Sequence, residues 1–171
     1  DIIIRKDIPS HEIIYFIKNS IILYPDIRPL ILVLKRYMQL NELNSSFSGG
    51  IYSYSLFLLM LAYVKKNKFD NNEGLGIKLY GFFEFYSKFI FSIYSINVNK
   101  DDPICLIDNN SNSGMILIYP ITGLNVARST FRVDEIKSIF AKGAIYISQI
   151  YYDLLNKSEE NDANIHNIDV N

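Results

Sequence analysis

Residues 43–61 read L-N-S-S-F-S-G-G-I-Y-S-Y-S-L-F-L-L-M-L, a polar turn with two glycines that runs directly into a nearly uninterrupted apolar segment. Gly49 and Gly50 allow backbone angles, and a close approach of neighbouring atoms, that a side chain would prevent. The apolar segment predicts a buried helix, and the first N–H groups of a helix have no acceptor within it. Such an end attracts anions, and residues 53–55 add two serine hydroxyls and a tyrosine ring. The residues alone leave two interpretations open: an ordinary turn before a core helix, or a site for a phosphate group and a base.

The composition is that of one folded domain with a hydrophobic core. Of 171 residues, 49% are hydrophobic and 20% are charged, which favours a globular chain over a disordered one. The net charge of −1 argues against a freestanding nucleic-acid-binding module, because such modules usually carry a strong basic excess. One cysteine excludes an internal disulfide, and two histidines argue against a closed zinc site. The longest apolar run, residues 51–64, is too short to cross a bilayer, so we expect no membrane span.

Apolar residues at helical spacing predict four further helices around the central one. Ser10 is a suitable N-cap for the first helix, which should end before Pro25, and Asp26 opens the second. The aromatic segment 75–94 predicts a third, and a last long helix begins at Asp134.

Shorter segments lie between these helices. Apolar runs at 103–107 and 115–120 flank a turn-rich loop and predict a small β-hairpin. Residues 158–171 are acidic and lack periodicity, which predicts a disordered tail. The expected fold class is therefore mainly α, a helical bundle with a small β-hairpin insert.

Four blocks of residues follow one another along the chain: R-P-L-I-L-V-L-K-R-Y at 28–37, L-N-S-S-F-S-G-G-I-Y-S-Y-S-L-F-L at 43–58, G-L-G-I-K-L-Y-G-F-F-E-F-Y at 74–86 and L-N-V-A-R-S-T-F at 124–131. In this order they resemble the noncanonical poly(A) RNA polymerases, the DNA polymerase sigma or TRAMP-type nucleotidyltransferases. The resemblance covers most of residues 1–157 and implies the helical central domain of these enzymes. It further implies that residues 74–133 are the PAP-associated, nucleotide-recognition region, and that most of the catalytic palm is missing from this sequence.

The resemblance implies a role for five residues in holding a nucleotide. Lys35 and Ser53 would hold the triphosphate, and Tyr54 would stack on the base. Asn125 and Arg128 would read the edge of the base from the recognition loop. The residues alone also allow a lysine that reaches the surface along an apolar helix, and two polar side chains that only pin an irregular loop.

The implied activity is that of a polynucleotide adenylyltransferase, which adds AMP from ATP to an RNA 3′ end without a template. Mg²⁺ or Mn²⁺ would be bound mainly by carboxylates of the palm. Asp1 is a candidate third carboxylate, both catalytic and metal-binding, although it can equally be an ordinary aspartate at the start of the sequence. The implied partners are ATP, the RNA 3′ end, a zinc-knuckle RNA-binding protein and a helicase. The implied location is nuclear, nucleolar included.

Five positions depart from the family pattern. Ile13 and Ile14 replace an Asn-Thr pair that contacts the ribose in related uridylyltransferases, and Gln39 replaces a second lysine. Tyr119 replaces an aspartate ahead of the recognition loop, and Leu124 replaces the histidine with which uridylyltransferases select uracil. Two alternatives to adenylyl transfer therefore stay open: a terminal uridylyltransferase, or an interaction platform that has lost its catalytic function.

Overall fold

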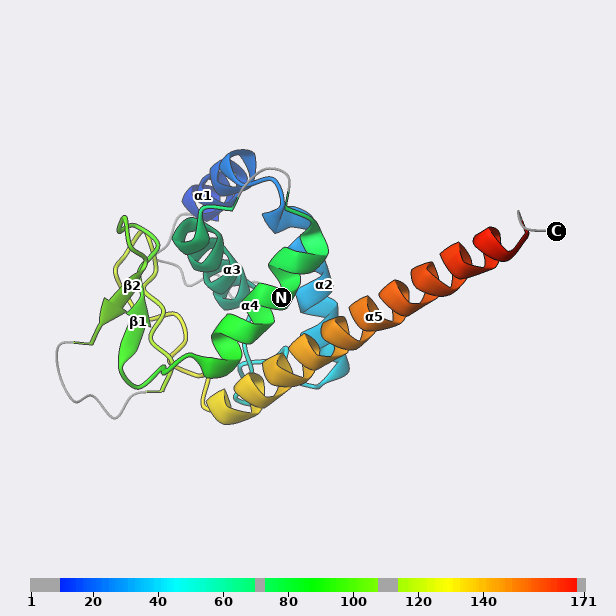
Figure 1. Cartoon of the computed structure of the whole chain (residues 1–171). Coiled ribbons are helices and arrows are strands. Elements are labelled where there is room, and N and C mark those ends of the chain that lie inside the picture. Colours follow the sequence, from blue (N-terminus) through cyan, green and yellow to red (C-terminus); the bar gives the residue numbers. More distant parts are fainter. Residues whose placement is uncertain (1–9, 70–72, 108–113, 169–171) are drawn as a thin grey trace.

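Five helices and one small sheet make up the part of the chain that the computed structural model describes, residues 10–69, 73–107 and 114–168 (Figure 1). In chain order the elements are α1 (Ser10–Leu23), α2 (Ile27–Leu40), α3 (Ser53–Asn67), α4 (Leu75–Lys88), β1 (Tyr94–Ile96), β2 (Ile104–Leu106) and α5 (Val133–Ile168). The prediction of a mainly α fold with a small strand-containing insert is confirmed.

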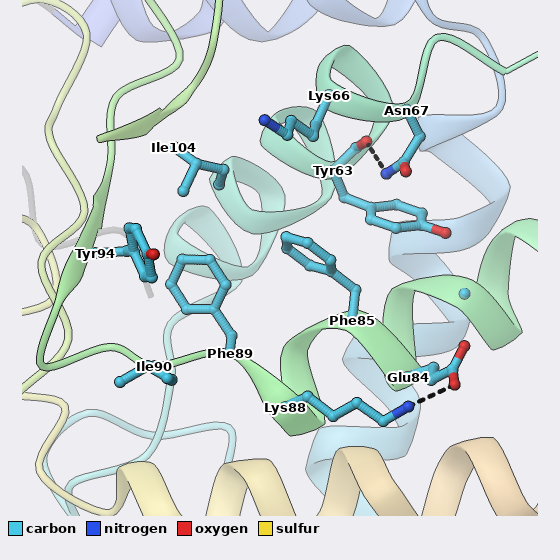
Figure 2. A pocket seen from close by; sticks show the side chains of 11 residues that line it. Tyr63, Lys66, Asn67, Glu84, Phe85, Lys88, Phe89, Ile90, Tyr94 and Ile104 are labelled. Atoms are coloured by element: carbon cyan, nitrogen blue, oxygen red, sulfur yellow. Dashed lines mark hydrogen bonds and ion pairs between the residues drawn. The ribbon is translucent and has the colours of Figure 1, made fainter. Parts of the chain in front are cut away.

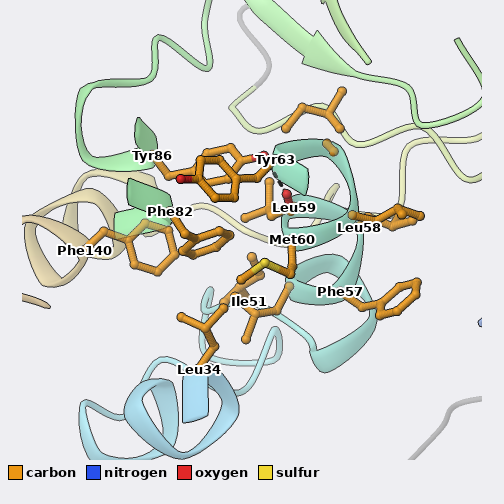
Figure 3. Close-up of a cluster of buried hydrophobic side chains, with 14 of the residues drawn as sticks. Leu34, Ile51, Phe57, Leu58, Leu59, Met60, Tyr63, Phe82, Tyr86 and Phe140 are labelled. Atoms are coloured by element: carbon orange, nitrogen blue, oxygen red, sulfur yellow. Dashed lines mark hydrogen bonds between the residues drawn. The ribbon is translucent and has the colours of Figure 1, made fainter. Parts of the chain in front are cut away.

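The core is built around α3. Its residues 55–64 are all buried, so the apolar segment is the core helix that its composition predicts (Figure 3). One face of α2 packs against it through Ile27, Leu30, Leu34 and Met38, whose spacing of three and four residues puts them on a single stripe. From α4, the fully buried Tyr86 donates a hydrogen bond of 2.7 Å from its hydroxyl to the Leu59 carbonyl oxygen of α3.

The first part of α5 closes the bundle against α4. Ile136 and Phe140 are fully buried, and the phenyl rings of Phe82 and Phe140 meet at 5.5 Å. Gly143 allows this close packing, because a Cβ atom there would lie 2.8 Å from the Phe83 ring. Beyond this contact α5 projects from the bundle (Figure 1), and its side chains from residue 149 to residue 157 are exposed.

Two predicted boundaries differ from the structure. The aromatic helix ends at Lys88 rather than Tyr94, because Phe89 and Phe91 turn into the core and the chain enters β1. Residues 158–168 continue α5 as a helix, whereas the sequence pattern predicted a disordered tail. No proline or glycine follows Gly143, so the two strongest helix-breaking residue types are absent from this segment.

One strand of the predicted hairpin pairs with a different segment. Residues 104–106 pair antiparallel with β1, Ile96 opposite Ile104, rather than with the apolar run at 115–120. That run lies on the other side of β1, where Ile96 and Leu117 form a single parallel bridge. No helix in the described ranges is long and apolar enough to span a bilayer.

Candidate nucleotide site at the start of α3

Both glycines of the 43–50 turn are required by the geometry. Gly49 has a φ of +83°, a left-handed conformation that side chains disfavour. A Cβ atom on Gly50 would lie 2.4 Å from the Leu43 carbonyl oxygen, which also accepts a 2.8 Å hydrogen bond from the Ile51 N–H. The predicted need for special angles and close approach is confirmed, and the atoms that approach Gly50 belong to the chain's own backbone.

Residues 121–131, which the resemblance assigns to base recognition and which we call the recognition loop, dock on this turn together with Arg132. The Thr130 hydroxyl donates to the Gly50 carbonyl oxygen at 3.0 Å, and the Arg132 N–H donates to the Gly49 carbonyl oxygen at 3.0 Å. The ring of Phe131 covers Gly49 so closely that a Cβ atom there would lie 2.4 Å from it. Two segments 80 residues apart in sequence are therefore joined at the entrance to α3.

Lys35 and Ser53 lie in one hollow of about 380 Å³ between α2 and the start of α3. Both residues are exposed, and neither side chain hydrogen-bonds to a described residue. Arg36, Gln39 and Asn44 complete the polar part of its lining. The sequence prediction missed Arg36 as a second cation here, because consecutive helical residues point about 100° apart and only the structure shows that both line the hollow.

The helix end at this hollow is uncapped. Tyr52 occupies the N-cap position of α3 and makes no side-chain capping bond, and the first helical hydrogen bond runs from the Leu56 N–H to the Tyr52 carbonyl oxygen. The N–H groups of residues 53–55 consequently have no acceptor among the described residues. Free N–H groups and the helix dipole both favour an anion at this position.

Tyr54 does not line this hollow. Its ring packs against Phe57, with ring centres 6.3 Å apart and an interplanar angle of 19°, and against Tyr119 at 5.6 Å. The hydroxyls of Tyr54 and Tyr119 are both buried without a partner among the described atoms. Burial raises the pKa of the Tyr54 phenol well above its ordinary value, with a smaller contribution from Tyr119, so the group is protonated at neutral pH.

The two polar residues of the recognition loop differ in their surroundings. The Asn125 amide oxygen accepts from the N–H groups of Leu117 at 3.0 Å and Ala127 at 2.9 Å, and its amide nitrogen donates to the Met115 carbonyl oxygen at 3.1 Å. Asn125 therefore pins the loop. Arg128 is exposed and makes no hydrogen bond or ion pair to the part of the chain described here, so its guanidinium is free to meet a ligand.

The predicted metal ligand Asp1 lies outside the described residues. Within the described residues, no three His, Cys, Asp or Glu side chains come together as a group that could hold a metal ion. The described residues thus do not fit a Mg²⁺ site of their own, and the site built from them is a pocket for the organic and phosphate parts of a ligand.

The similarities of the chain to known proteins agree with this architecture. No protein-family model matches it. It is 27% identical over 78% of its length to the inactive non-canonical poly(A) RNA polymerase protein Trf4-2 of Drosophila melanogaster, and 23% identical over 68% to poly(A) RNA polymerase protein 2 of Saccharomyces cerevisiae. The chain spans only 37% and 23% of these two proteins.

Two solved structures share the fold. One is the polymerase core of TRAMP, an RNA surveillance complex, with a TM-score of 0.64, 24% identity and coverage of 74% of this chain and 44% of that one. The other is a cytoplasmic RNA terminal U-transferase, with a TM-score of 0.63, 18% identity and coverage of 72% and 53%. The resemblance seen in the sequence is thereby confirmed, and the chain is a homologue of part of the non-canonical poly(A) RNA polymerases over most of its own length.

Proposed function

We propose that this chain is the nucleotide- and RNA-positioning domain of a template-independent RNA 3′-end nucleotidyltransferase that transfers AMP from ATP. The observation that carries the proposal is the hollow at the start of α3, which Lys35 and Ser53 both line, at a helix end whose first N–H groups have no acceptor among the described residues. A triphosphate is a polyanion that needs several donors and positive charge at once. The similarity to poly(A) RNA polymerases supports the same substrate class.

Each side chain has an assigned part in this proposal. The Lys35 ammonium is a compact charge whose three donors can follow the phosphate oxygens, and Ser53 adds a hydroxyl donor. In the family a second lysine follows one turn after the first, and here Gln39 takes its place. Arg36, which also lines the hollow, supplies the second cation instead. Tyr54 lies outside this hollow, packed against Phe57 and Tyr119, and we propose that it stacks on the base from there, an interaction worth about 1–3 kcal/mol for any base. A preference for ATP must therefore come from contacts with the edge of the base.

We assign that edge contact to Arg128, with Asn125 as the residue that holds the loop in place. The Asn125 amide is occupied by three backbone groups, whereas the Arg128 guanidinium has its five donors available in a planar fork. Leu124, 56% exposed, lies beside them and offers no hydrogen bond to uracil. This combination supports ATP over UTP.

The roles proposed for these residues do not involve the divalent metal ion that the resemblance implies. In nucleotidyltransferases a bound divalent ion activates the attacking hydroxyl and stabilises the leaving pyrophosphate. We propose that carboxylates of a palm domain hold it, because the described residues supply no suitable group.

A nucleotide-addition assay with the full-length protein and an oligoadenylate primer tests the proposal. We expect incorporation from ATP in preference to UTP, and a KM for ATP raised about tenfold by Lys35→Ala, since a hydrogen bond to a charged group is worth about 1.5–3 kcal/mol. Tyr54→Ala should raise this KM severalfold. Lys142→Ala, an exposed lysine on α5, is the matched control and should leave KM unchanged. No incorporation of any nucleotide, or an unaltered KM in Lys35→Ala, would contradict the proposal.

One observation favours the interaction platform as a second candidate. The Drosophila relative is named as inactive, and this chain departs from the family pattern at several positions that would contact the nucleotide. The platform predicts no incorporation even when the full-length protein contains intact palm carboxylates. The uridylyltransferase alternative instead predicts incorporation from UTP in preference to ATP in the same assay.

The location and protein partners are proposals as well. We propose a nuclear protein that works with an RNA helicase and a zinc-knuckle RNA-binding protein, as the resemblance to the TRAMP-type enzymes implies. Fluorescent tagging of the full-length protein tests the location, and a signal confined to the cytoplasm would contradict it. Affinity purification with the same tag tests the partners.

A further inference from the structure

A second hollow, of about 670 Å³, lies at the far end of α3 from Lys35. It is enclosed by the C-terminal part of α3, by α4 and by the small sheet, and four aromatic rings line it: Tyr63, Phe85, Phe89 and Tyr94 (Figure 2). Tyr63 and Phe89 are buried, whereas Phe85 and Tyr94 are only partly buried and so are accessible in part. Such rings can stack with planar groups of any base sequence.

Two lysines flank the rings on opposite sides (Figure 2). Lys66 pairs with Asp102 at 2.6 Å, and Lys88 pairs with Glu84 at 2.7 Å. In both pairs each side chain is at least 41% exposed, and ion pairs of this kind contribute little because water competes for both charges. A phosphate group can therefore replace either carboxylate at small cost.

The neighbouring Lys65 is not available for the same purpose. Its ammonium donates to the Val98 carbonyl oxygen at 2.7 Å and to the Lys100 carbonyl oxygen at 3.1 Å, which ties α3 to the turn between the strands. Of the lysines that close α3, it is thus Lys66 that faces the aromatic hollow.

The two hollows lie at opposite ends of one helix. Ser53 begins α3 and lines the first hollow, and Asn67 ends it and lines the second. At 1.5 Å per residue the helix separates them by roughly 20 Å. A stacked strand with about 3.4 Å per nucleotide covers that distance with about six nucleotides.

We propose that the aromatic hollow binds single-stranded RNA upstream of its 3′ end, with a base stacked on Phe85 or Tyr94 and the flanking phosphates on Lys66 and Lys88. The inference rests on the proposed function in one respect: it assumes that the RNA 3′ end reaches the nucleotide held at Lys35. The chemistry is that of proteins that bind single strands without sequence preference, a ring platform with cations along the backbone path. The net charge of −1 agrees with RNA contacts at a few lysines rather than with a broad basic binding surface.

The test measures binding of a fluorescently labelled oligoadenylate of about ten nucleotides to the full-length protein by anisotropy, without ATP and over a range of salt concentrations. The double variant Lys66→Gln with Lys88→Gln should bind about tenfold more weakly at low salt. Its plot of log affinity against log salt should be shallower by about 1.4, because a single strand contributes about 0.7 for each phosphate contact. Phe85→Leu, which keeps an apolar side chain and removes the ring, should also weaken binding about tenfold.

Two controls make the result decisive. Lys142→Gln with Lys157→Gln removes two exposed lysines of α5 and should leave affinity and salt dependence unchanged. Thermal melting followed by circular dichroism shows whether each variant is folded, and the lysine variants change only exposed side chains. If the folded Lys66/Lys88 variant binds RNA as tightly as the wild type, the proposal is overturned and the hollow is left for a partner protein.

The outcome is separable from that of the proposed function. Binding is measured without nucleotide transfer, so a protein that adds no nucleotide can still give either answer here. If transfer is normal in the wild type, primers of about four nucleotides should have a higher KM than primers of about ten, because only the longer ones reach both hollows. The Lys66/Lys88 variant should lose that difference.

Discussion

The ion pair between Lys78 and Asp26 gives the sharpest stability prediction. The ammonium of Lys78 lies 2.5 Å from the Asp26 carboxylate, and the lysine side chain is only 4% exposed whereas that of Asp26 is 42% exposed. Asp26 stands at the N-cap of α2 without a side-chain capping bond, so its replacement costs the ion pair rather than a cap. Besides Asp26, the ammonium faces the ring of Phe69, 5.5 Å from the ring centre.

The difference in exposure between Lys78 and Asp26 determines how much stability each substitution should cost. Removal of one partner from a fully buried pair costs about 3–5 kcal/mol, because the other charge is left buried and unpaired. Water reaches the Asp26 side, so we expect Asp26→Ala to cost about 2 kcal/mol. Lys78→Met removes the buried charge itself, keeps most of the packing over Phe69 and leaves a solvated carboxylate, so it should cost about 1 kcal/mol.

Urea denaturation followed by far-UV circular dichroism measures both variants. A loss of about 2 kcal/mol lowers the melting temperature of a chain of this size by about 4–8 °C. The double variant should be no less stable than Lys78→Met alone, since the carboxylate has no buried charge left to neutralise. Glu84→Ala, at an exposed ion pair, is the control and should be unchanged within error. The reasoning is refuted if Lys78→Met is more destabilising than Asp26→Ala.

Three further predictions concern the turn, the loop and the core. Gly50→Ala places a Cβ atom against the Leu43 carbonyl oxygen and should cost about 2–3 kcal/mol by thermal melting, and a loss below 1 kcal/mol would show that the turn is plastic. Asn125→Ala removes three hydrogen bonds from the recognition loop and should abolish hydrogen-exchange protection there while α3 stays protected; unchanged protection would contradict the assigned role. Burial raises the pKa of the Tyr86 phenol well above its ordinary 10.0, so its contribution to stability is complete below pH 10 and is lost as the pH rises further. Phenolate absorbance of this residue, identified by comparison with Tyr86→Phe, should appear only together with the loss of helical circular dichroism.

Helices could be predicted because their signals are local. The apolar stripe of α2 and the continuous apolar run of α3 are visible in the sequence, and Pro25 marks the end of α1. The end of α4 has no such marker. Phe89 and Phe91 continue the apolar pattern, and only their burial against the core shows that the helix has stopped.

Strand pairing was not predictable, because it depends on which segments meet in space. Residues 104–106 have an apolar neighbour on either side in sequence, and both lie within hairpin reach. In the structure β1 takes the central place, with 104–106 on one side and Leu117 on the other. The sequence pattern identified 103–107 and 115–120 as strand-forming, but it placed Tyr94 in a helix and so missed β1, the strand that contacts both.

In the candidate site, too, residue types could be predicted from the sequence but their contacts in space could not. The double glycine, Lys35 and Ser53 could be named from the sequence, since each has a chemical reason to be there. The neighbours that these residues face in space could not be predicted from the sequence. Residues 53 and 54 are one helix step apart and so point about 100° from one another, which is why Ser53 lines the hollow with Lys35 while Tyr54 packs against Tyr119.

The docking of the recognition loop on the glycine turn has a practical consequence for engineering. Because Thr130 and Arg132 fasten one end of the loop to backbone carbonyls and Asn125 fastens its beginning, the path of the loop is independent of its exposed side chains. Leu124 and Arg128 project from a scaffold that does not need them. Under the proposed function, we expect exchange of those two side chains alone to change the nucleotide preference, whereas an insertion or deletion between the anchors would displace the entrance to α3.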